Sequence, residues 1–473
     1  MPLILPGNVA SATAGAFSVA NSCRFNDGDS PHMEKDQGTP TSQNKYTYSG
    51  WIKKCTNTAG DEQHIFSLGD GGDSVYNGFR FKTNDTLELK MDSTDTGSGI
   101  ITTNRVFRDP AAWYHIVVGV DTTQGTAANR VKLYVNGVQE TSFSTATYPT
   151  EDRDYAFLAS GQEVHIGNQA SSGNTEYFDG YMAEVVFIDG LQLAATSFGE
   201  FNSDSPTIWQ PIDVSGLTFG TNGFYLDFEA SDNLGNDANG GTDLTEVNLA
   251  ATDQATDTPT NNFCTLNPLI RQVAEETGGL SEGNTEVLFS GASWGGVSST
   301  MAPAAGKWYF EGKLIANGSN SIIGVVPANT QGKDNTGTWY IGQYSGEQAY
   351  QNNGAASNGG ASFGNTYTDG DIIGVALDCD NAKVYFSKNG TLENSGDPSS
   401  GATGTGAMSL TAGEFYTPAV SGNGVTNWEM NFGNPPYANS SDAADANGYG
   451  AFEYAPPSGY LALCTKNLGS DGG

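Results

Sequence analysis

The segment GDIIGVALDCDNAKVYFSKNG, residues 370–390, decides the fold of this chain. It consists of an apolar run, an acidic turn, a second apolar run and the pair Asn389-Gly390, a pair typical of turns with positive φ. A second segment, AWYHIVVGVDTTQGTAANRVKLYVNGV at 112–138, follows the same plan with a longer turn and contains Asn136-Gly137. The repetition predicts two antiparallel hairpins, each at the centre of a jelly-roll sandwich.

Alternation along each hairpin predicts which side chains face the core, because successive residues of a strand point to opposite faces. In the downstream hairpin the predicted inward set is Ile373, Val375, Leu377, Val384 and Phe386. In the upstream hairpin it is Ile116, Val118, Val120, Leu133 and Val135.

Short alternating runs separated by Gly, Asn, Asp, Ser and Thr occupy residues 17–230 and resume over 284–435. This pattern is typical of antiparallel strands joined by turns. We therefore predict an all-β protein with two tandem antiparallel jelly-roll β-sandwiches. The N-terminal arm, 1–16, and the Pro- and Tyr-containing tail, 436–473, are expected to lie along a domain surface or, alternatively, to dock onto a neighbouring subunit.

The segment between the sandwiches, residues 231–283, is acidic and rich in turn residues, and we expect it to be a connector. It contains NPLIRQVAEETGG, in which Asn267 can cap a helix and Pro268 suits the first helical position. The sequence therefore predicts one short connecting helix over 268–277.

The composition excludes several classes of partner and site. The chain of 473 residues has 20 Lys and Arg against 53 Asp and Glu, a net charge of −33, which argues against nucleic acid or an anionic membrane as a partner. Its five scattered cysteines form no C-x-x-C pair, so we expect free, buried thiols rather than disulfides or a cysteine zinc site. The N-terminus is a poor secretion signal, and no run approaches the roughly 18 apolar residues of a membrane helix. We expect no signal peptide and assembly in a cytoplasm.

Two sets of motifs resemble known families. AAWYHIVVGVDTTQGTAANRVKLYVNGVQ at 111–139, followed by YFDGYMAEVVFIDG at 177–190, resembles a laminin G-like domain of the concanavalin A type. GKWYFEGKL at 306–314, the hairpin at 370–390 and NWEMNFG at 427–433 resemble a SPRY domain. The order of the two domains is similar to that of structural proteins of tailed, marine bacteriophages, and this resemblance implies a virion protein.

The sequence offers no catalytic constellation. Glycoside hydrolysis needs two carboxylates about 5–9 Å apart, and the Glu-x-Asp-x-x-Glu strand of the related sandwich glycosidases does not occur. Asp227 and Glu229 are the nearest approach to a pair, and we expect them to be solvated. His115 and His165 lie inside strand patterns as satisfied core or edge residues, and no nucleophile elbow, zinc-protease motif or phosphate loop is present. We predict a protein that is not an enzyme. Core positions are predicted for Trp51, Trp113, Trp308 and Trp428.

Calcium is the one ion that the oxygen-rich turns suit, and no cofactor is required. Asp, Asn and Gly also form turns without an ion, which is the commoner case. The turn residues that suggest calcium are Asp70, Asp73, Asp92, Asp95, Asp232, Asn236, Asp237 and Asp243.

Glycan binding is predicted for the polar, Gly-rich stretch 327–365, where Trp339, Tyr340 and other aromatics are interleaved with amides. In a SPRY domain, loops near this strand form the usual binding face. We expect Trp339 to be core and assign the ligand-binding role to Tyr344, Tyr350, Gln351, Asn352 and Asn353.

These observations favour a non-enzymatic phage virion component on a tail fibre or the capsid exterior, which contributes to attachment to a host surface glycan. One alternative is a decoration or cement protein that binds only other virion subunits. Another is an extracellular bacterial protein that binds or cleaves glycans. A homo-trimer would suit an attachment fibre, although no heptad repeat enforces one.

Overall fold

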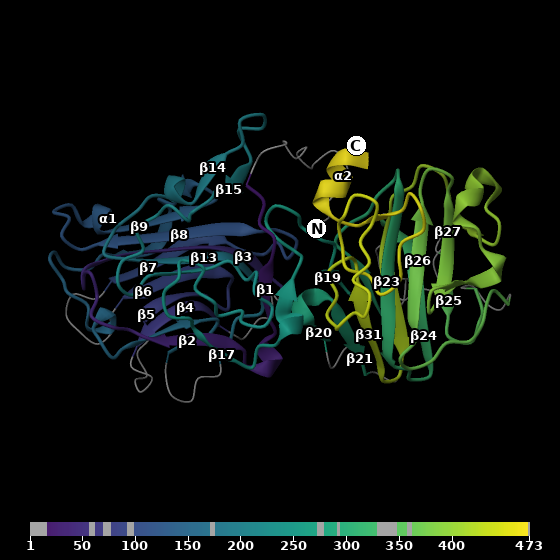
Figure 1. Cartoon of the computed structure of the whole chain (residues 1–473), viewed down its shortest axis with the longest axis horizontal. Helices are drawn as coiled ribbons and strands as arrows, with labels where there is room; N and C mark the ends of the chain where they lie inside the picture. Colours follow the sequence, from purple (N-terminus) through teal and green to yellow (C-terminus); the bar gives the residue numbers. More distant parts are fainter. Residues whose placement is uncertain are drawn as a thin grey trace. The chain divides into compact units, whose positions relative to one another are not determined.

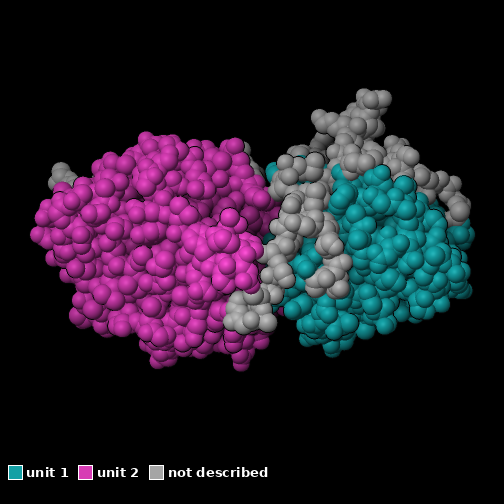
Figure 2. Space-filling model, turned by 90° about the horizontal axis from the view of Figure 1, so that it is seen from above, with its two compact units in different colours: residues 1–12, 261–473 teal, residues 13–260 magenta. Residues whose placement is uncertain are grey.

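The computed structural model describes residues 17–55, 62–69, 77–91, 99–170, 176–271, 279–290, 294–328, 348–356 and 362–471. The chain divides into an N-terminal unit, Thr13–Thr260, and a C-terminal unit that begins at Asn261 (Figure 2). The expected arm at 1–16 lies outside the described residues. Among the helices described, none has both the length and the apolar character needed to cross a membrane.

Two antiparallel sheets build the N-terminal unit (Figure 1). The first sheet, in the order β10-β9-β8-β3-β13-β1-β18 with β16 beside β13, comprises β1 (Ser22–Phe25), β3 (Lys45–Lys54), β8 (Tyr114–Asp121), β9 (Val131–Val135), β10 (Val138–Gln139), β13 (Gly180–Asp189), β16 (Phe224–Leu226) and β18 (Gln254–Ala255). The second sheet, in the order β11-β7-β6-β5-β4-β12-β2-β17, comprises β2 (His32–Asp36), β4 (Gln63–Gly69), β5 (Asn77–Phe81), β6 (Thr86–Met91), β7 (Gly99–Val106), β11 (Phe143–Thr147), β12 (Glu163–Ile166) and β17 (Thr245–Val247). A separate hairpin pairs β14 (Gly199–Phe201) with β15 (Trp209–Pro211). The short helices are η1 (Asp27–Asp29), α1 (Ala127–Arg130), η2 (Ala156–Leu158), η3 (Ala195–Ser197) and η4 (Ala251–Asp253).

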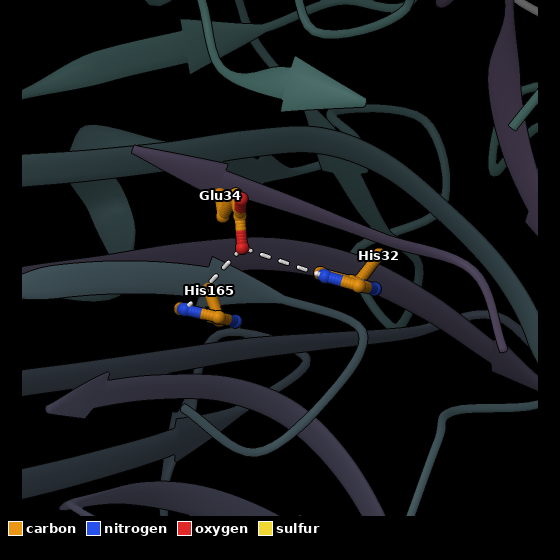
Figure 3. Close-up of side chains that lie close together, drawn as sticks. All are labelled: His32, Glu34 and His165. Atoms are coloured by element: carbon orange, nitrogen blue, oxygen red, sulfur yellow. Dashed lines mark ion pairs between the residues drawn. The ribbon is translucent and has the colours of Figure 1, made fainter. Parts of the chain in front are cut away.

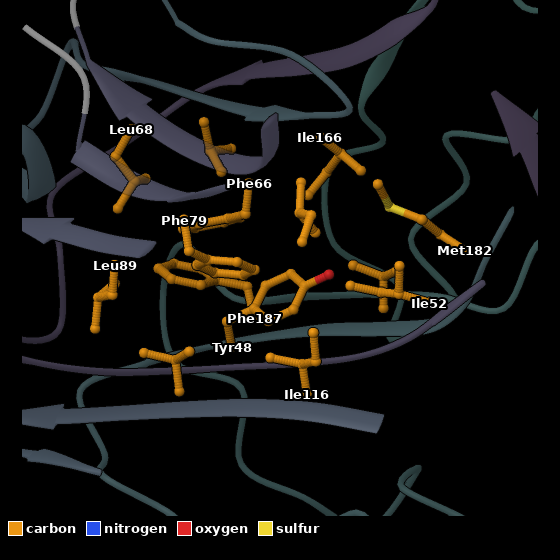
Figure 4. Close-up of a cluster of buried hydrophobic side chains, with 14 of the residues drawn as sticks. Tyr48, Ile52, Phe66, Leu68, Phe79, Leu89, Ile116, Ile166, Met182 and Phe187 are labelled. Atoms are coloured by element: carbon orange, nitrogen blue, oxygen red, sulfur yellow. The ribbon is translucent and has the colours of Figure 1, made fainter. Parts of the chain in front are cut away.

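The core of this unit lies between the two sheets and is rich in aromatic side chains (Figure 4). The Phe66 ring of the second sheet lies 5.1 Å from the ring of Tyr48 and 5.5 Å from that of Phe187, both on the first sheet. Side chains from the two sheets therefore interdigitate, as in other aligned sandwiches.

The first sheet is covered on both faces. Tyr181, Ala183 and Ile188 of β13 face away from the main core and pack with Phe198 and Trp209 of the segment that follows β13. This explains why β13 is buried along its whole length and has the sequence of a continuous apolar run. The outer face of the second sheet carries polar and charged side chains, among them His64, Glu88 and His165, which are largely buried.

The C-terminal unit also consists of two sheets, which are antiparallel except at β32 (Figure 1). The third sheet, in the order β19-β22-β30-β24-β25, comprises β19 (Leu266–Arg271), β22 (Trp294–Ser299), β24 (Asn320–Pro327), β25 (Gln348–Gln351) and β30 (Tyr416–Asn423). The fourth sheet, in the order β20-β21-β31-β23-β26-β27-β28, comprises β20 (Gly279–Ser281), β21 (Glu286–Phe289), β23 (Lys307–Ala316), β26 (Ile372–Asp378), β27 (Lys383–Lys388), β28 (Thr391–Leu392) and β31 (Thr426–Asn431), and β29 (Met408–Ser409) and β32 (Leu461–Ala462) pair with β27 and β23. The short helices are η6 (Glu282–Asn284), η8 (Glu393–Ser395), η9 (Pro398–Thr403) and α2 (Thr465–Asp471).

The predicted all-β fold and both predicted hairpins are confirmed. β8 pairs with β9 and β26 pairs with β27, and every side chain that the alternation placed inward belongs to a core cluster. Asn136 and Asn389 have φ of 48° and 47°, and the glycines that follow them also have positive φ, as the turn residues predicted. The four tryptophans predicted to be core are buried, and all five cysteines are free and buried.

The predicted connecting helix is wrong over its first part. Residues 266–271 form β19, which pairs with β22, because Leu266 enters the core of the C-terminal unit. The rest of the predicted helix, 272–277, lies outside the described residues.

The expected connector over 231–283 is divided between the two units rather than standing apart from them. β17 and β18 complete the edges of the second and first sheets. Lys53 and Asp257, both fully buried, form an ion pair of 2.6 Å, and the indole N–H of Trp113 donates to the same carboxylate at 3.0 Å. A buried ion pair thus holds the end of this segment in the N-terminal unit.

The tail at 436–473 is part of the C-terminal unit over its described residues. β32 runs parallel to β23, and Phe452 and Tyr460 pack in a buried cluster with Tyr309 and Tyr385. Because a strand and these aromatics belong to it, the segment contributes to the stability of the unit.

Candidate functional site

An aromatic-lined cavity of about 450 Å³ lies on the outer side of the first sheet. Trp51 and Trp113 form part of its wall together with Trp209, and all three are largely buried. Phe201, 44% exposed, stands at the mouth, where it contacts the Trp209 ring edge to face at 4.9 Å. The cavity is of the size that binds small ligands, about 300–1,000 Å³.

His115 on β8 fixes the orientation of the Trp209 indole. Its ring is stacked between Trp51 at 4.7 Å and Trp209 at 5.9 Å. The Trp209 Nε1–H donates to His115 Nδ1 at 2.8 Å, so the proton of the imidazole lies on Nε2 and is donated to Ser49 Oγ at 2.8 Å. Burial lowers the pKa of His115 to about 3, so this ring stays neutral. His115 is thus the satisfied core residue that its strand pattern predicted.

The turn formed by Asn136 and Gly137, between β9 and β10, lies directly against the cavity. A Cβ added to Gly137 would lie 2.2 Å from Cε3 of Trp209, so only glycine allows this approach. Asn136 and Arg105 bring polar groups to the lining, and Arg105 Nε donates to Glu140 Oε2 at 2.8 Å. Polar groups therefore form the larger part of the accessible lining, and ring and aliphatic surfaces form the rest.

Four of the five glycan-binding residues predicted in the C-terminal unit lie within the described residues. The prediction of an exposed Tyr350 is wrong, because its side chain is fully buried against Phe363 and Tyr367. Gln351 donates from Nε2 to Asn320 Oδ1 at 3.0 Å. Asn352 Oδ1 accepts from the N–H of Ser321 at 3.3 Å, and Asn353 Oδ1 accepts from the N–H of Ala355 at 2.9 Å. Tyr344, Trp339 and Tyr340 lie outside the described residues.

The predicted calcium ligands are only partly described. Asp70, Asp73, Asp92 and Asp95 lie outside the described residues, whereas Asp232 is exposed, Asn236 is partly buried and Asp237 is buried. The Asp237 carboxylate accepts the backbone N–H groups of Tyr225, Asn239 and Gly241 at 2.9, 3.1 and 3.1 Å. These bonds shape a turn, which is the role that aspartate takes more commonly than ion binding.

A cluster of histidine and carboxylate side chains lies on the outer face of the second sheet (Figure 3). His32 and Glu34 project from β2, and His165 projects from β12 directly opposite Glu34. Glu34 Oε2 lies 3.5 Å from His32 Nε2 and 3.8 Å from His165 Nε2. Glu163 Oε2 lies 3.1 Å from His165 Nε2. We call these four residues the His32 cluster.

A second group, Glu62, His64 and Glu176, occupies another part of the same face. His64 Nε2 lies 2.8 Å from Glu176 Oε2, and this hydrogen bond lowers the pKa of Glu176. Arg80 forms ion pairs with Glu62, with Glu176 and, at 3.1 Å, with Glu88. A guanidinium therefore already balances the carboxylates of this group.

Sequence reasoning missed Phe201, Trp209 and the His32 cluster. Trp209 lies on a three-residue strand whose pattern is too short to reveal which face it occupies. The His32-x-Glu34 spacing did place two ligand-type side chains on one face of a strand. Their partner His165 comes from a strand far along the chain, so its register was not visible in the sequence.

Comparisons with known proteins agree with the two units. Residues 27–194 match the Laminin_G_3 family model of the concanavalin A-like lectin/glucanases superfamily, and residues 307–434 match the SPRY domain. The predicted succession of a laminin G-like and a SPRY domain is confirmed.

Individual relatives are distant. The Ran-binding proteins 9/10 homolog of Drosophila melanogaster is 28% identical over 120 residues, which is 24% of this chain and 12% of that relative's length. The crystal structure of the human HERC1 SPRY domain matches 35% of this chain and 96% of its own, with 14% identity and a TM-score of 0.26. The heptameric SAP-like pentraxin from Limulus polyphemus matches 39% of this chain and 76% of its own, with 18% identity and a TM-score of 0.26.

Proposed function

We propose that this chain, which carries a laminin G-like, concanavalin A-like domain followed by a SPRY domain, is a non-enzymatic protein that binds a saccharide in its aromatic cavity. The observation that carries the proposal is the joint presence of three tryptophans, Phe201 and a few polar groups around one cavity. The exposed ring of Phe201 is an apolar surface against which the C–H face of a sugar can pack. Arg105 and Asn136 supply hydrogen-bonding groups for the hydroxyls.

The composition of the cavity supports binding without hydrolysis. Among the described residues that line it, none is an aspartate or a glutamate. Glycoside hydrolysis needs two carboxylates across the sugar. Asp227, the nearest approach to a catalytic pair in the sequence, accepts the backbone N–H of Glu229 at 3.0 Å.

A glycan array on the full chain, followed by calorimetry with the best saccharide, tests the proposal. Phe201→Ala is expected to weaken binding at least tenfold, because the exposed ring at the mouth is removed. Phe415→Ala is the matched control, since Phe415 is a similarly exposed phenylalanine, 39% against 44%, in the C-terminal unit. If both variants bind the saccharide as tightly as the unchanged chain, the cavity is not the binding site. Hydrolysis of the saccharide would contradict the non-enzymatic role.

The setting we propose is the exterior of a phage particle, on a tail fibre or the capsid, where the cavity would contact a host surface glycan. The support is the resemblance of the domain order to structural proteins of tailed phages, and other virion subunits are the expected partners. Cryo-electron microscopy of the particle tests this setting. A distal position with the mouth at Phe201 open to solvent supports attachment, whereas burial of this mouth against other subunits indicates a cement protein.

Calcium binding in the turn around Asp232, Asn236 and Asp237 and a trimeric state stay predictions. Equilibrium dialysis with calcium and sedimentation velocity measurements test them. One bound calcium that is lost in Asp232→Ala would support the ion, and a monomer would contradict the trimer.

A further inference from the structure

The hydrogen bonds of the two histidines in the His32 cluster fix their tautomers. His32 Nδ1 faces the carbonyl oxygen of Ser30 at 3.4 Å, and His165 Nδ1 faces Asn168 Oδ1 at 2.9 Å. Since both oxygens can only accept, each Nδ1 carries a proton that it donates. Each Nε2 then faces carboxylate oxygens (Figure 3). His32 Nε2 lies 3.5 Å from Glu34 Oε2, whereas His165 Nε2 lies 3.8 Å from Glu34 Oε2 and is hydrogen-bonded to Glu163 Oε2 at 3.1 Å. A hydrogen bond from the far ring nitrogen to an oxygen is the usual support of a metal-ligating histidine.

The spacing of the ligand atoms suits a tetrahedral metal ion. One ring nitrogen each of His32 and His165 and a carboxylate oxygen of Glu34 all lie within 4.8 Å of one another. Bond lengths of about 2.0–2.2 Å around a tetrahedral zinc place neighbouring ligand atoms roughly 3.3–3.5 Å apart. The distances of 3.5 and 3.8 Å to Glu34 Oε2 need to change by only a few tenths of an ångström.

The scaffold holds these side chains in place. Glu34 and His165 are directly opposite each other in the pairing of β2 with β12, and their neighbours Met33 and Ile166 are fully buried in the core. Sites on paired, anchored strands keep their geometry better than sites on loops.

The charge balance also favours a cation. Across the described residues, the ion pairs of Glu34 and Glu163 involve histidines only. The Glu62–His64–Glu176 group differs, because Arg80 supplies its positive charge.

We propose that His32, Glu34 and His165 bind a divalent transition-metal ion of the zinc type. Imidazole nitrogen with carboxylate oxygen is a ligand set that zinc accepts, whereas calcium prefers oxygen alone. The ion would join β2 to β12. The metal site lies on the second sheet and the aromatic cavity lies on the outer side of the first sheet. The proposal of a metal site and the proposal of saccharide binding can therefore be tested independently.

Isothermal titration of the chelator-treated full chain with zinc chloride tests the site, and cobalt(II) absorption reports the geometry. We expect one zinc ion per chain and the intense visible bands of tetrahedral cobalt. Glu34→Gln, which keeps the side-chain shape, is expected to lower the affinity at least tenfold, and His165→Ala more than a hundredfold.

His64→Ala is the matched control, because it removes a histidine from the Arg80-balanced group on the same face. Its zinc affinity is expected to stay within twofold of the unchanged chain. Should His165→Ala fail to fold by circular dichroism, Glu34→Gln decides the question alone. The proposal is overturned if the unchanged chain binds no zinc, if Glu34→Gln binds zinc unaltered, or if His64→Ala loses it.

Discussion

The side-chain oxygen of Asn136 accepts the backbone N–H of His115 at 2.8 Å, and the N–H of Asn136 donates to the carbonyl oxygen of the same residue at 2.9 Å. Asn389 makes the same two bonds with Ile372, at 2.9 and 2.8 Å. One asparagine thus fixes the left-handed turn and ties it to the start of the neighbouring strand in both units. The sequence repetition corresponds to a repetition of hydrogen bonds.

Asn389→Ala is expected to destabilise the C-terminal unit by about 2 kcal/mol. The left-handed conformation costs an alanine about 1 kcal/mol, and the lost hydrogen bond contributes about 1 kcal/mol more. Urea unfolding followed by tryptophan fluorescence measures the change. Glycine adopts the left-handed conformation without strain, so Asn389→Gly should lose only the stabilisation from the hydrogen bond. Equal destabilisation by Asn389→Ala and Asn389→Gly would show that the left-handed conformation does not contribute.

Asp257→Ala is expected to destabilise the N-terminal unit by about 3–5 kcal/mol, because it leaves the buried Lys53 ammonium without its counter-ion. The indole N–H of Trp113 also loses its acceptor. Differential scanning calorimetry measures the change in the melting temperature. Asp232→Ala, at an exposed position of the same segment, is the control and should change stability little. A similarly small effect of Asp257→Ala would show that the pair is not needed.

Glu184 on β13 is expected to make the N-terminal unit less stable as the pH rises from 4.5 to 7. Burial raises its pKa from 4.5 to about 7, while the phenol of Tyr225 donates to it at 2.6 Å. The folded unit therefore holds one proton more than the unfolded chain in this window. The stabilisation that protonated Glu184 gives the folded unit is complete below pH 4.5 and is lost as the pH rises through 7. The shift corresponds to a loss on the order of 3 kcal/mol.

Glu184→Gln tests this dependence, because glutamine resembles the protonated acid and does not titrate. As the pH rises from 4.5 to 7, the melting temperature of the unchanged chain should fall relative to that of Glu184→Gln. Parallel profiles would mean that Glu184 has an ordinary pKa in the folded unit.

Glu311→Gln is expected to loosen the C-terminal segment from β23. The carboxylate accepts four donors: the hydroxyl of Tyr309 at 3.0 Å, the amide of Asn431 at 3.2 Å, and the N–H groups of Glu453 and Tyr454 at 3.0 and 2.8 Å. A glutamine NH₂ would face two of these donors, at a cost of roughly 3 kcal/mol. Hydrogen–deuterium exchange should rise in peptides from 440–462.

Glu429→Gln, on the neighbouring strand β31, is the control for this exchange measurement. It should leave protection of the 440–462 peptides unchanged, because its side chain forms an ion pair with Lys313 at 3.6 Å. Unchanged protection in Glu311→Gln as well would mean that the aromatic packing of Phe452 and Tyr460 alone holds the segment.

The fold was predictable from the sequence where a local pattern determines the structure. Alternation placed Val118 and Val375 inward, and Asn-Gly pairs placed the turns, because both signals depend on adjacent residues. The helix prediction failed at Leu266–Arg271, where burial in the core overrides the capping signal of Asn267 and Pro268.

The sites were less predictable, because they depend on which strands become neighbours. Tyr350 alternates on β25 so that its ring enters the core, and composition could not reveal that. The cavity needs Trp51 and Trp209, which β3 and the β14–β15 hairpin bring together across the first sheet. No spacing rule connects such distant positions.

Because residues 231–283 are divided between the two units, they determine where the chain can be divided into fragments for separate expression. A fragment that ends at residue 230 lacks β17, β18 and Asp257, and one that starts at 284 lacks β19, β20 and the buried Cys264. Each would expose unpaired strand edges, which promote aggregation. The division between Thr260 and Asn261 is therefore the place to separate the two units for expression.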